Sequence, residues 1–286
     1  MTERPGGVLH VVATPIGNLD DLSPRAREAL ASASLVACED TRRTAKLLAR
    51  FELTVPMLPV HKFSERETLA EVLAVLAEGK AVALVSDGGT PAISDPGALL
   101  VEAALDAGFR ISPVPGPSAV VTLLSASGLP ADRFVFDGFL PAREGERRKR
   151  LRALATETRT VVVYEAPHRI RAALDDLASI LGARTVVLGR ELTKIHETIV
   201  RGTAVSIAAS LGDGEVRGEI VLAIAGADET GSTAPEGDET LRRTWEEALA
   251  AADGDERDAL KAASKALGLK KPEVWRRLAE LGLVRA

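Results

Sequence analysis

The chain has 286 residues, of which 46% are hydrophobic and 27% charged, and its formal net charge is −5 at pH 7. A chain of this length can bury one large core or two moderate ones, and this composition fits a soluble enzyme. The single cysteine excludes an intrachain disulfide, and the acidic balance argues against a protein that coats nucleic acid through bulk charge.

No apolar stretch approaches the ~20 residues that a membrane-spanning helix needs. Residues 2–7 also lack the charged and apolar pattern of a signal peptide. We therefore expect a cytoplasmic protein that makes no membrane contact.

The first predicted strand is the apolar run over residues 8–13, which ends in a polar loop, TPIGNLDD. Ser23 and Pro24 then give the hydroxyl cap and first-turn proline of a helix. Cys38 lies in the next apolar run, where a buried structural thiol is expected rather than a nucleophile. Helices are expected over residues 24–32, 41–50, 65–78 and 96–107.

The most informative stretch is residues 82–97, VALVSDGGTPAISDPG. A short apolar run without alternation is typical of a strand that is covered on both faces of a parallel sheet. Gly88 and Gly89 allow positive φ or a close approach to a ligand, and Asp95 followed by Pro96 predicts a helix N-cap. The alternative is an ordinary turn from strand to helix.

A third strand is predicted over residues 111–114, and it ends in PGPSA. If these three strands run parallel, their loops lie along one edge of a sheet, where open α/β sheets bind ligands. Neither the dinucleotide fingerprint G-x-G-x-x-G nor the P-loop G-x-x-x-x-G-K-[ST] is present. The ligand is therefore not expected to be a nucleotide di- or triphosphate.

The rest of the chain continues as alternating strands and helices and then becomes purely helical. Further strands are expected over residues 134–136, 160–164, 185–188 and 219–225, with helices between the first three. Two helices, 258–267 and 272–281, are expected near the C-terminus. The predicted organisation is an N-terminal α/β domain (1–116), a second α/β domain (117–226), a flexible linker (227–240) and a helix-turn-helix-like domain (241–286).

Two basic clusters are candidates for contact with RNA. The first, over residues 143–152, follows Phe139, and its arginines cannot all share one helix face. Arginines next to an aromatic ring could hold an RNA strand by charge and stacking. The second cluster surrounds the predicted C-terminal turn. An ordinary solvated surface is the alternative for both clusters. The residues expected to contact RNA are Arg42, Arg147, Arg150, Lys270 and Lys271.

Several motifs in order resemble those of the RsmI-type ribosomal RNA methyltransferases of the tetrapyrrole methylase superfamily. The resemblance covers about residues 8–226 and rests on ATPIGNL (13–19), CEDTR (38–42), SDGGTPAISDPG (86–97), PGPSA (115–119), YEAPHR (164–169), RELTKIHE (190–197) and GEIVL (218–222). It implies two α/β domains with the active-site cleft between them and a small C-terminal all-α domain. The implied activity is S-adenosylmethionine-dependent methylation of the ribose 2′-oxygen of a cytidine in 16S ribosomal RNA.

The resemblance also implies which residues hold the methyl donor, S-adenosylmethionine. A glycine-containing loop would surround its amino acid part and sulfonium, a second loop would oppose it, and a further set would line the adenosine side. These donor-binding residues are Pro15, Asp87, Gly88, Gly89, Thr90, Ile93, Pro117, Ser118, Ala119, Tyr164, Leu192, Gly218, Glu219 and Ile220. No metal is expected, because the four histidines lack ligand spacing.

A general base could assist methyl transfer, because a protonated ribose hydroxyl is a poor nucleophile. The candidates in motif positions are Asp40, Glu165, His168, Glu191 and His196. For Asp40 the alternative is an N-cap to the helix from Thr41, and for His168 it is a hydrogen-bonded histidine at a helix start after Pro167. The sequence does not rank these candidates.

Three classes of function stay open at this point. The first is an RNA methyltransferase that acts on 16S RNA or the small ribosomal subunit. Such a protein is expected to form a homodimer and not to bind DNA. The second is a methylase that acts on a corrin or porphyrin. The third is a noncatalytic RNA-binding protein, which would not bind the methyl donor.

Overall fold

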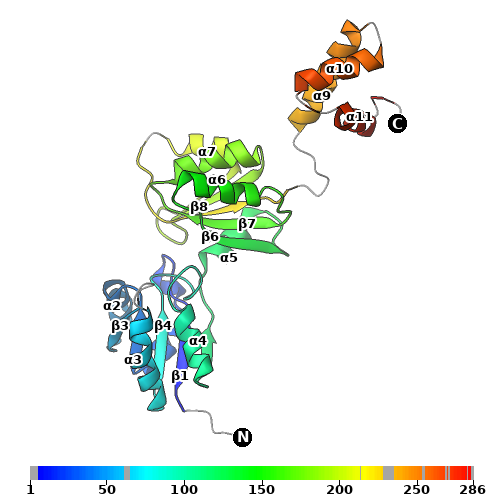
Figure 1. The fold of residues 1–286 in the computed structure, drawn as a ribbon. Helices are drawn as coiled ribbons and strands as arrows, with labels where there is room; N and C mark the ends of the chain where they lie inside the picture. The colour runs from blue at the N-terminus through cyan, green and yellow to red at the C-terminus, as the bar shows by residue number, and fades with distance from the viewer. Residues whose placement is uncertain are drawn as a thin grey trace. The chain divides into compact units, whose positions relative to one another are not determined.

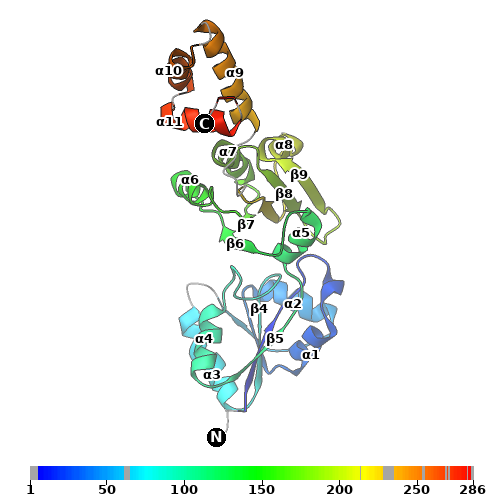
Figure 2. The ribbon, with the colours of Figure 1, turned by 90° about the vertical axis from the view of Figure 1, so that its right-hand side faces the viewer.

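The computed structural model describes residues 6–60, 65–212, 214–227, 235–252, 255–267, 269, 271–281 and 283–284. The chain forms two compact units, Met1–Gly226 and Ala227–Ala286. The first unit contains two five-stranded sheets, each with helices on both faces (Figures 1 and 2).

The first sheet is entirely parallel, in the order β3-β2-β4-β1-β5. Its strands are β1 (Val8–Val12), β2 (Leu35–Cys38), β3 (Met57–Pro59), β4 (Ala81–Val85) and β5 (Arg110–Val114). The helices between them are α1 (Pro24–Ser32), α2 (Thr41–Arg50), α3 (Glu65–Ala77) and α4 (Ala98–Asp106), and a 3-10 turn, η1 (Leu19–Asp21), follows β1.

Burial explains why the strand sequences do not alternate. All four residues of β2 are buried, because α1 and α2 cover one face of the sheet and α3 and α4 cover the other. Cys38 is fully buried in this core, as predicted. The carboxyl ends of β1, β4 and β5 lie along one edge, which confirms the predicted placement of their loops.

Two helix starts follow their predicted caps and a third does not. The Ser23 hydroxyl accepts from the Ala26 amide at the start of α1, and the Asp40 carboxylate accepts from the Arg42 amide at the start of α2. The predicted N-cap at Asp95 is wrong. Helix α4 begins at Ala98 after Gly97, whose φ of 122° is open to glycine, and Asp95 stays in the loop.

The second sheet is mixed, in the order β6-β7-β10-β8-β9. Its strands are β6 (Phe134–Phe139), β7 (Thr160–Glu165), β8 (Thr185–Arg190), β9 (Thr198–Thr203) and β10 (Ile220–Ile224). Strand β10 runs antiparallel to both β7 and β8, whereas β6 and β7 are parallel. Helices α6 (Glu144–Ala153), α7 (Ile170–Leu181) and α8 (Ala204–Ser210) pack on one face, and α5 (Ala119–Ser127) packs on the other.

The sequence did not predict β9 or α8. Strand β9 has little fully buried surface, so its apolar pattern is weak. A signal for α8 was present in a capping box in which Thr203 and Ser206 each accept from the other's backbone amide. The predicted helix start near Pro167 is also displaced, because α7 begins at Ile170. The domain boundary at 116/117 falls between β5 and α5 and stays a prediction.

The C-terminal unit has three helices, α9 (Pro235–Ala251), α10 (Glu256–Leu267) and α11 (Lys271–Glu280). Trp245 from α9 is buried against Ala263 of α10 and Leu278 of α11. The linker prediction for 227–240 is therefore wrong from residue 235 onward, because α9 starts there with a proline, a residue suited to the first helical turn. Within the described part of the chain, no helix has the length and apolar character needed to cross a membrane.

Candidate active site

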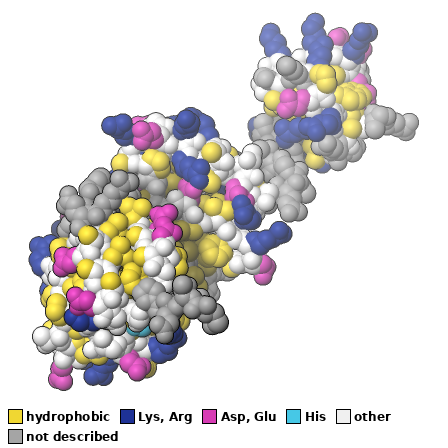
Figure 3. Space-filling view, turned by 60° about the horizontal axis from the view of Figure 1, so that its bottom comes forward, with side chains coloured by type: hydrophobic (Ala, Val, Ile, Leu, Met, Phe, Trp, Pro, Cys, Tyr) yellow, Lys and Arg dark blue, Asp and Glu magenta, His cyan; other side chains and the backbone are white. Residues whose placement is uncertain are grey.

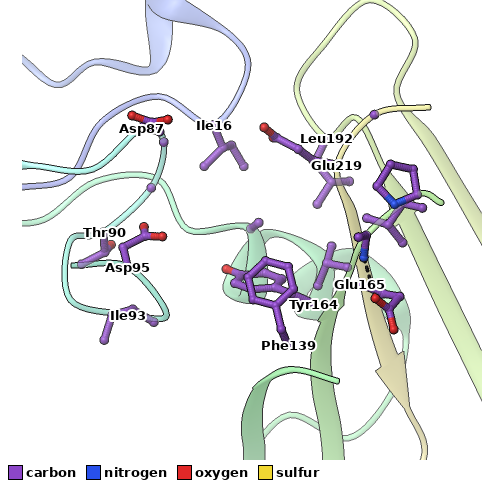
Figure 4. A pocket seen from close by; sticks show the side chains of 18 of the residues that line it. Ile16, Asp87, Thr90, Ile93, Asp95, Phe139, Tyr164, Glu165, Leu192 and Glu219 are labelled. Atoms are coloured by element: carbon purple, nitrogen blue, oxygen red, sulfur yellow. Dashed lines mark hydrogen bonds between the residues drawn. The ribbon is translucent and has the colours of Figure 1, made fainter. Parts of the chain in front are cut away.

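A cavity of about 370 Å³ lies where the loops of the first sheet face the second sheet. Figure 4 shows Asp87, Thr90 and Asp95 on one side of it and Tyr164 and Leu192 on the other. Its lining residues are Ile16, Glu39, Arg43, Asp87, Gly88, Gly89, Thr90, Ile93, Asp95, Ala119, Phe139, Tyr164, Glu165, Ala166, Pro167, Leu192, Gly218, Glu219, Ile220 and Val221.

The first wall of the cavity is the loop that follows β4. Thr14 and Gly89 exchange two backbone hydrogen bonds of 2.9 Å, which hold this loop against the loop after β1. Gly89 has a φ of 90°, and a Cβ at Gly88 would lie 3.2 Å from the carbonyl oxygen of Pro15. The two glycines therefore let the backbone approach both its neighbour and the cavity.

The same loop holds two non-glycine residues in the left-handed region. The φ angles of Ala92 and Ser94 are 68° and 69°. Such conformations cost on the order of 1–3 kcal/mol each and persist where the surrounding structure imposes them, often at functional sites. This strain shapes the turn that brings Ile93 and Asp95 to the cavity.

Asp95 carries the most perturbed carboxyl group of the cavity. Burial, together with the negative charges of Glu39, Asp87 and Glu219 and against a hydrogen bond from Ser86, raises the pKa of Asp95 to about 6. A carboxylate with a pKa near neutrality is a stronger proton acceptor than an ordinary one and still loses its proton at physiological pH. Asp95 is therefore the lining carboxylate best suited to act as a base.

A chain of ionic contacts crosses from the first sheet to the second. Arg43 on α2 lies 3.4 Å from Asp87 and 3.9 Å from Glu219, measured between nitrogen and oxygen. Lys194 in turn lies 3.2 Å from Glu219 and 2.8 Å from Glu191. These contacts link the two walls at an exposed edge of the site.

The second wall is apolar and aromatic. The Tyr164 ring contacts Phe136 and Phe139, with centroid distances of 5.1 and 5.2 Å. Burial, followed by the negative charges of Asp95 and Glu219, raises the pKa of Tyr164 to about 12. The phenol therefore stays neutral, and the rings offer flat and aliphatic surface, whereas the charge of this wall comes from glutamates such as Glu219.

The structure brings most of the predicted donor-binding residues to the cavity. Pro15, Pro117 and Ser118 do not line it. Pro15 and Pro117 instead contact residues of the lining. The carbonyl of Pro15 lies against Gly88, and the carbonyl of Pro117 accepts a hydrogen bond from the Thr90 hydroxyl at 3.4 Å. Donor binding by this set stays a prediction. The predicted donor-binding residues that do line the cavity are Asp87, Gly88, Gly89, Thr90, Ile93, Ala119, Tyr164, Leu192, Gly218, Glu219 and Ile220.

The predicted catalytic residues are arranged less favourably. Asp40, His168 and Glu191 do not line the cavity. Hydrogen bonds from Arg42 hold the pKa of Asp40 well below its usual range, as expected of the N-cap that it forms. Burial alone would raise the pKa of Glu191, but hydrogen bonds from Lys194 and the Glu219 amide outweigh it and lower the value. Both carboxylates are thus poor proton acceptors, and we revise their assignment as bases.

Glu165 lines the cavity but is engaged in structure. Its side chain is fully buried, and its Oε1 accepts from the Ala166 amide at 2.7 Å and lies 2.6 Å from Arg169. Its Oε2 is buried without a hydrogen-bond partner among the described residues. A catalytic role for Glu165 stays a prediction.

Sequence reasoning missed three polar members of the site, Glu39, Arg43 and Asp95, and it considered Phe139 only as an RNA contact beside a basic cluster. Glu39 and Asp95 lie inside motifs that were recognised, so their motif positions were a usable signal. Asp95 was instead assigned to a helix cap that the structure does not form. Arg43 and Phe139 reach the cavity only through the folding of α2 and β6, and no local pattern marked either of them as a cavity residue.

The residues expected to contact RNA divide into three groups. The Arg147 side chain is 5% exposed and lies 2.7 Å from Asp176, so we withdraw Arg147 because its guanidinium is committed to the core. Arg42 and Lys271 are exposed, and Arg150 is 46% exposed while paired with Asp137. Lys270 lies outside the described residues. On the face shown in Figure 3, Lys and Arg side chains are scattered, and several belong to the C-terminal unit.

The described residues contain no cluster of three His, Cys, Asp or Glu side chains arranged to hold a metal ion. The site thus offers backbone, carboxylates, one arginine and an aromatic wall. Such a set can bind and orient an organic ligand that bears positive charge.

Comparison with known proteins identifies relatives over most of the chain. It is 52% identical over 225 residues to a ribosomal RNA small subunit methyltransferase I of Xylella fastidiosa (strain Temecula1), covering 77% of this chain and 82% of the relative. It is 46% identical over 238 residues to the protein of that name in Pseudomonas aeruginosa, covering 82% and 83%.

Solved structures share the fold at low sequence identity. A methyltransferase named CobJ has a TM-score of 0.59 at 23% identity, covering 77% of this chain and 95% of that one. A uroporphyrin-III-C-methyltransferase of Thermus thermophilus has a TM-score of 0.56 at 22% identity, covering 77% and 94%. Residues 8–208 match the tetrapyrrole (corrin/porphyrin) methylases, and the chain belongs to this family.

Proposed function

We propose that this protein transfers a methyl group from S-adenosylmethionine to the ribose 2′-oxygen of a cytidine in 16S ribosomal RNA. The names of its relatives support small-subunit RNA as the acceptor. The observation that carries the proposal is the cavity, which gathers most of the residues that the family resemblance assigns to the donor.

The cavity fits the donor in size and charge. Its volume of about 370 Å³ lies within the range of small-molecule sites. Asp87, Asp95 and Glu219 supply negative charge, which suits a sulfonium, and Gly88 and Gly89 keep space open beside it. Bound there, the donor would supply an electrophilic methyl group to an in-line displacement.

The protein's own contribution would be positioning and proton removal. Alignment of two reactants can supply about 7–11 kcal/mol of barrier reduction in favourable cases. The strained loop around Asp95 and the wall around Tyr164 would fix donor and acceptor on opposite sides. We assign Asp95 as the base that accepts the hydroxyl proton, because its raised pKa suits that role better than those of Asp40 and Glu191.

The test of the proposed activity is direct. The purified protein, with labelled S-adenosylmethionine, should methylate small ribosomal subunits from cells that lack the gene. Mapping of 2′-O-methyl marks should show one cytidine that is modified only when the gene is present. A parallel incubation with a porphyrinogen tests the alternative suggested by the named uroporphyrin methylase.

Each result decides between the three classes of function. Label in the porphyrinogen and none in RNA would replace the proposed acceptor. Failure to bind S-adenosylmethionine by calorimetry would favour a noncatalytic RNA-binding protein.

We further propose that the C-terminal unit serves RNA binding and that Arg42 and Arg150 contribute to it. Lys271 is exposed on α11, a helix of a unit separate from the cavity. Removal of residues 227–286 should weaken binding to small subunits and leave donor binding unchanged. Equal affinity of the truncated and complete proteins would mean that Lys271 and the rest of the C-terminal unit form an ordinary solvated surface.

The oligomeric state and location are also proposals. We infer a homodimer, because family members commonly pair, and a cytoplasmic location, because the proposed acceptor is the ribosomal subunit. A monomeric mass by light scattering across micromolar concentrations would overturn the first. Fractionation of cells with an antibody to the protein tests the second.

A further inference from the structure

An irregularity in β6 turns one aromatic ring toward the cavity. Strands β6 and β7 pair regularly as far as Phe136 with Val162, and then Phe139 pairs with Tyr164 where regular pairing would place Gly138. One extra residue in a strand moves the following side chains to the other face of the sheet. The bulge therefore places Phe139 on the face of Phe136 and Tyr164, which is the cavity wall.

Gly138 makes this bulge possible. Its φ of 67° is in the left-handed region, and a Cβ there would lie 3.2 Å from the Ser94 hydroxyl on the opposite loop. A regular strand would have placed Phe139 on the face that carries the core around Leu140, where it could be buried. In the observed fold the Phe139 ring is not buried in that core.

The redirected ring is open to solvent. Phe139 is 55% exposed, although it touches the Tyr164 ring and lines the cavity (Figure 4). Aromatic residues make up only 3% of the chain, yet three of them, Phe136, Phe139 and Tyr164, gather at this wall. An exposed ring at the rim of a site, placed there by a bulge, favours contact with a second flat ring.

We propose that Phe139 is the platform on which the base of the acceptor nucleotide stacks. This inference rests on the proposed function and specifies how its substrate is held. An RNA strand is too large for a cavity of about 370 Å³, so a single nucleotide must leave the strand to bring its ribose to the donor. Its unstacked base then needs a partner at the entrance, and proteins supply aromatic rings for this purpose.

An exposed arginine is tied to the same strand. Arg150 on α6 donates from Nε to Asp137 at 2.7 Å, two residues before Phe139. Asp137 is 9% exposed and holds the guanidinium in place, while Arg150 itself remains 46% exposed. A fixed, exposed arginine that is paired with the strand carrying the stacking ring can meet a phosphate of the same RNA.

The experiment compares Phe139→Leu, which keeps apolar bulk without a ring, with Phe139→Trp, which keeps a ring. The matched control is Phe134→Leu, on the same strand, 38% exposed and outside the cavity lining. Methyl transfer to small subunits gives KM and kcat for each protein, calorimetry gives the Kd for S-adenosylmethionine, and thermal unfolding shows that each variant is folded.

Phe139→Leu should raise the KM for small subunits about 5- to 150-fold, the range of base–aromatic stacking at ~1–3 kcal/mol per base. The Kd for S-adenosylmethionine should not change. Phe139→Trp and Phe134→Leu should both stay close to the unaltered protein. Recovery by a different ring would not be expected if Phe139 only filled space.

Two results would overturn the stacking role while leaving the proposed function intact. One is a Phe139→Leu variant with an unchanged KM. The other is a loss of donor affinity that matches the loss of activity, which would assign the ring to the adenine of the donor. If the unaltered protein transfers no methyl to small subunits, the proposed function fails first, and the acceptor assignment falls with it.

Discussion

The two walls of the cavity are built by different means. The first wall comes from a parallel sheet and presents backbone, two glycines and carboxylates on a strained loop. The second comes from a mixed sheet and presents mainly rings and aliphatic side chains, with Glu219 at its exposed edge. The comparison suggests a division of labour in which the first wall handles charge and proton transfer and the second handles flat, apolar surfaces.

The largest effect is expected from a side chain that fills the ligand space beside the first wall. Gly89→Val places a β-branched side chain at a φ of 90° and beside the ligand space, so donor binding should become undetectable by calorimetry. The control is Gly145→Val, at an exposed position of helix α6, where an added Cβ meets nothing within 4 Å. Normal donor binding by a folded Gly89→Val variant would show that this loop does not hold the donor.

Removal of the proposed base should have the next largest effect. Asp95→Asn should lower kcat by about 10²-fold or more, the usual contribution of a positioned base, with donor affinity retained. In the unaltered protein kcat should fall as pH drops through about 6, because Asp95 then gains its proton. The variant should lack this acidic limb, and a limb of unchanged position would assign the titration to another group.

The same substitution should stabilise the fold at neutral and alkaline pH. The pKa of Asp95 rises from 3.8 to about 6 on folding, so the folded state favours the protonated form. Stability from this group is present at low pH and lost as pH rises through about 6. Asp95→Asn should therefore raise the free energy of unfolding in urea at pH 8 and change it little at pH 4. A lower stability at pH 8 would contradict the assigned cost of burying this carboxylate beside other negative charges.

The second wall is tested by altering its bulge. Gly138→Ala forces a Cβ into the left-handed region, at a cost of about 1–2 kcal/mol, and crowds Ser94. It should also raise the KM for small subunits several-fold, because Phe139 is displaced. Gly128→Ala is the control, because Gly128 is left-handed with a φ of 65° and has nothing within 4 Å of its Cβ. Equal loss of stability with loss of activity only in Gly138→Ala would locate the effect in the site.

The smallest effect is expected from the ionic contact that links the walls. Arg43 is 59% exposed and Glu219 65% exposed, and such pairs contribute about 0–1 kcal/mol. Arg43→Gln should therefore change kcat/KM less than about five-fold, with the difference shrinking at high salt. A much larger loss that persists at high salt would mean that Arg43 contacts substrate directly.

Local sequence pattern was sufficient to predict much of the secondary structure around the first sheet. Helices α1 and α2 begin and end where the caps and apolar spacing predicted, because Ser23 and Asp40 act on amides within their own first turns. The elements around the second sheet were predicted less completely. Strand β9 was missed because its side chains are at most partly buried and its apolar pattern is correspondingly weak.

Sequence alone also determined the family resemblance, the order of the strands and loops along the chain, and most of the cavity-lining residues. These follow from short segments whose chemistry is readable without knowing what they touch. Fold class and the edge that carries the ligand loops belong to the same level, since parallel strands of buried type have few alternative arrangements.

Only the tertiary structure decided the roles of Asp95, Arg147 and Phe139. The raised pKa of Asp95 depends on burial and on carboxylates far along the chain. Arg147 is committed to Asp176, 29 residues away, and Phe139 faces the cavity through a change of register against β7. Each role depends on the positions of groups distant in sequence, and electrostatic shifts, buried ion pairs and strand register arise only when those groups come together.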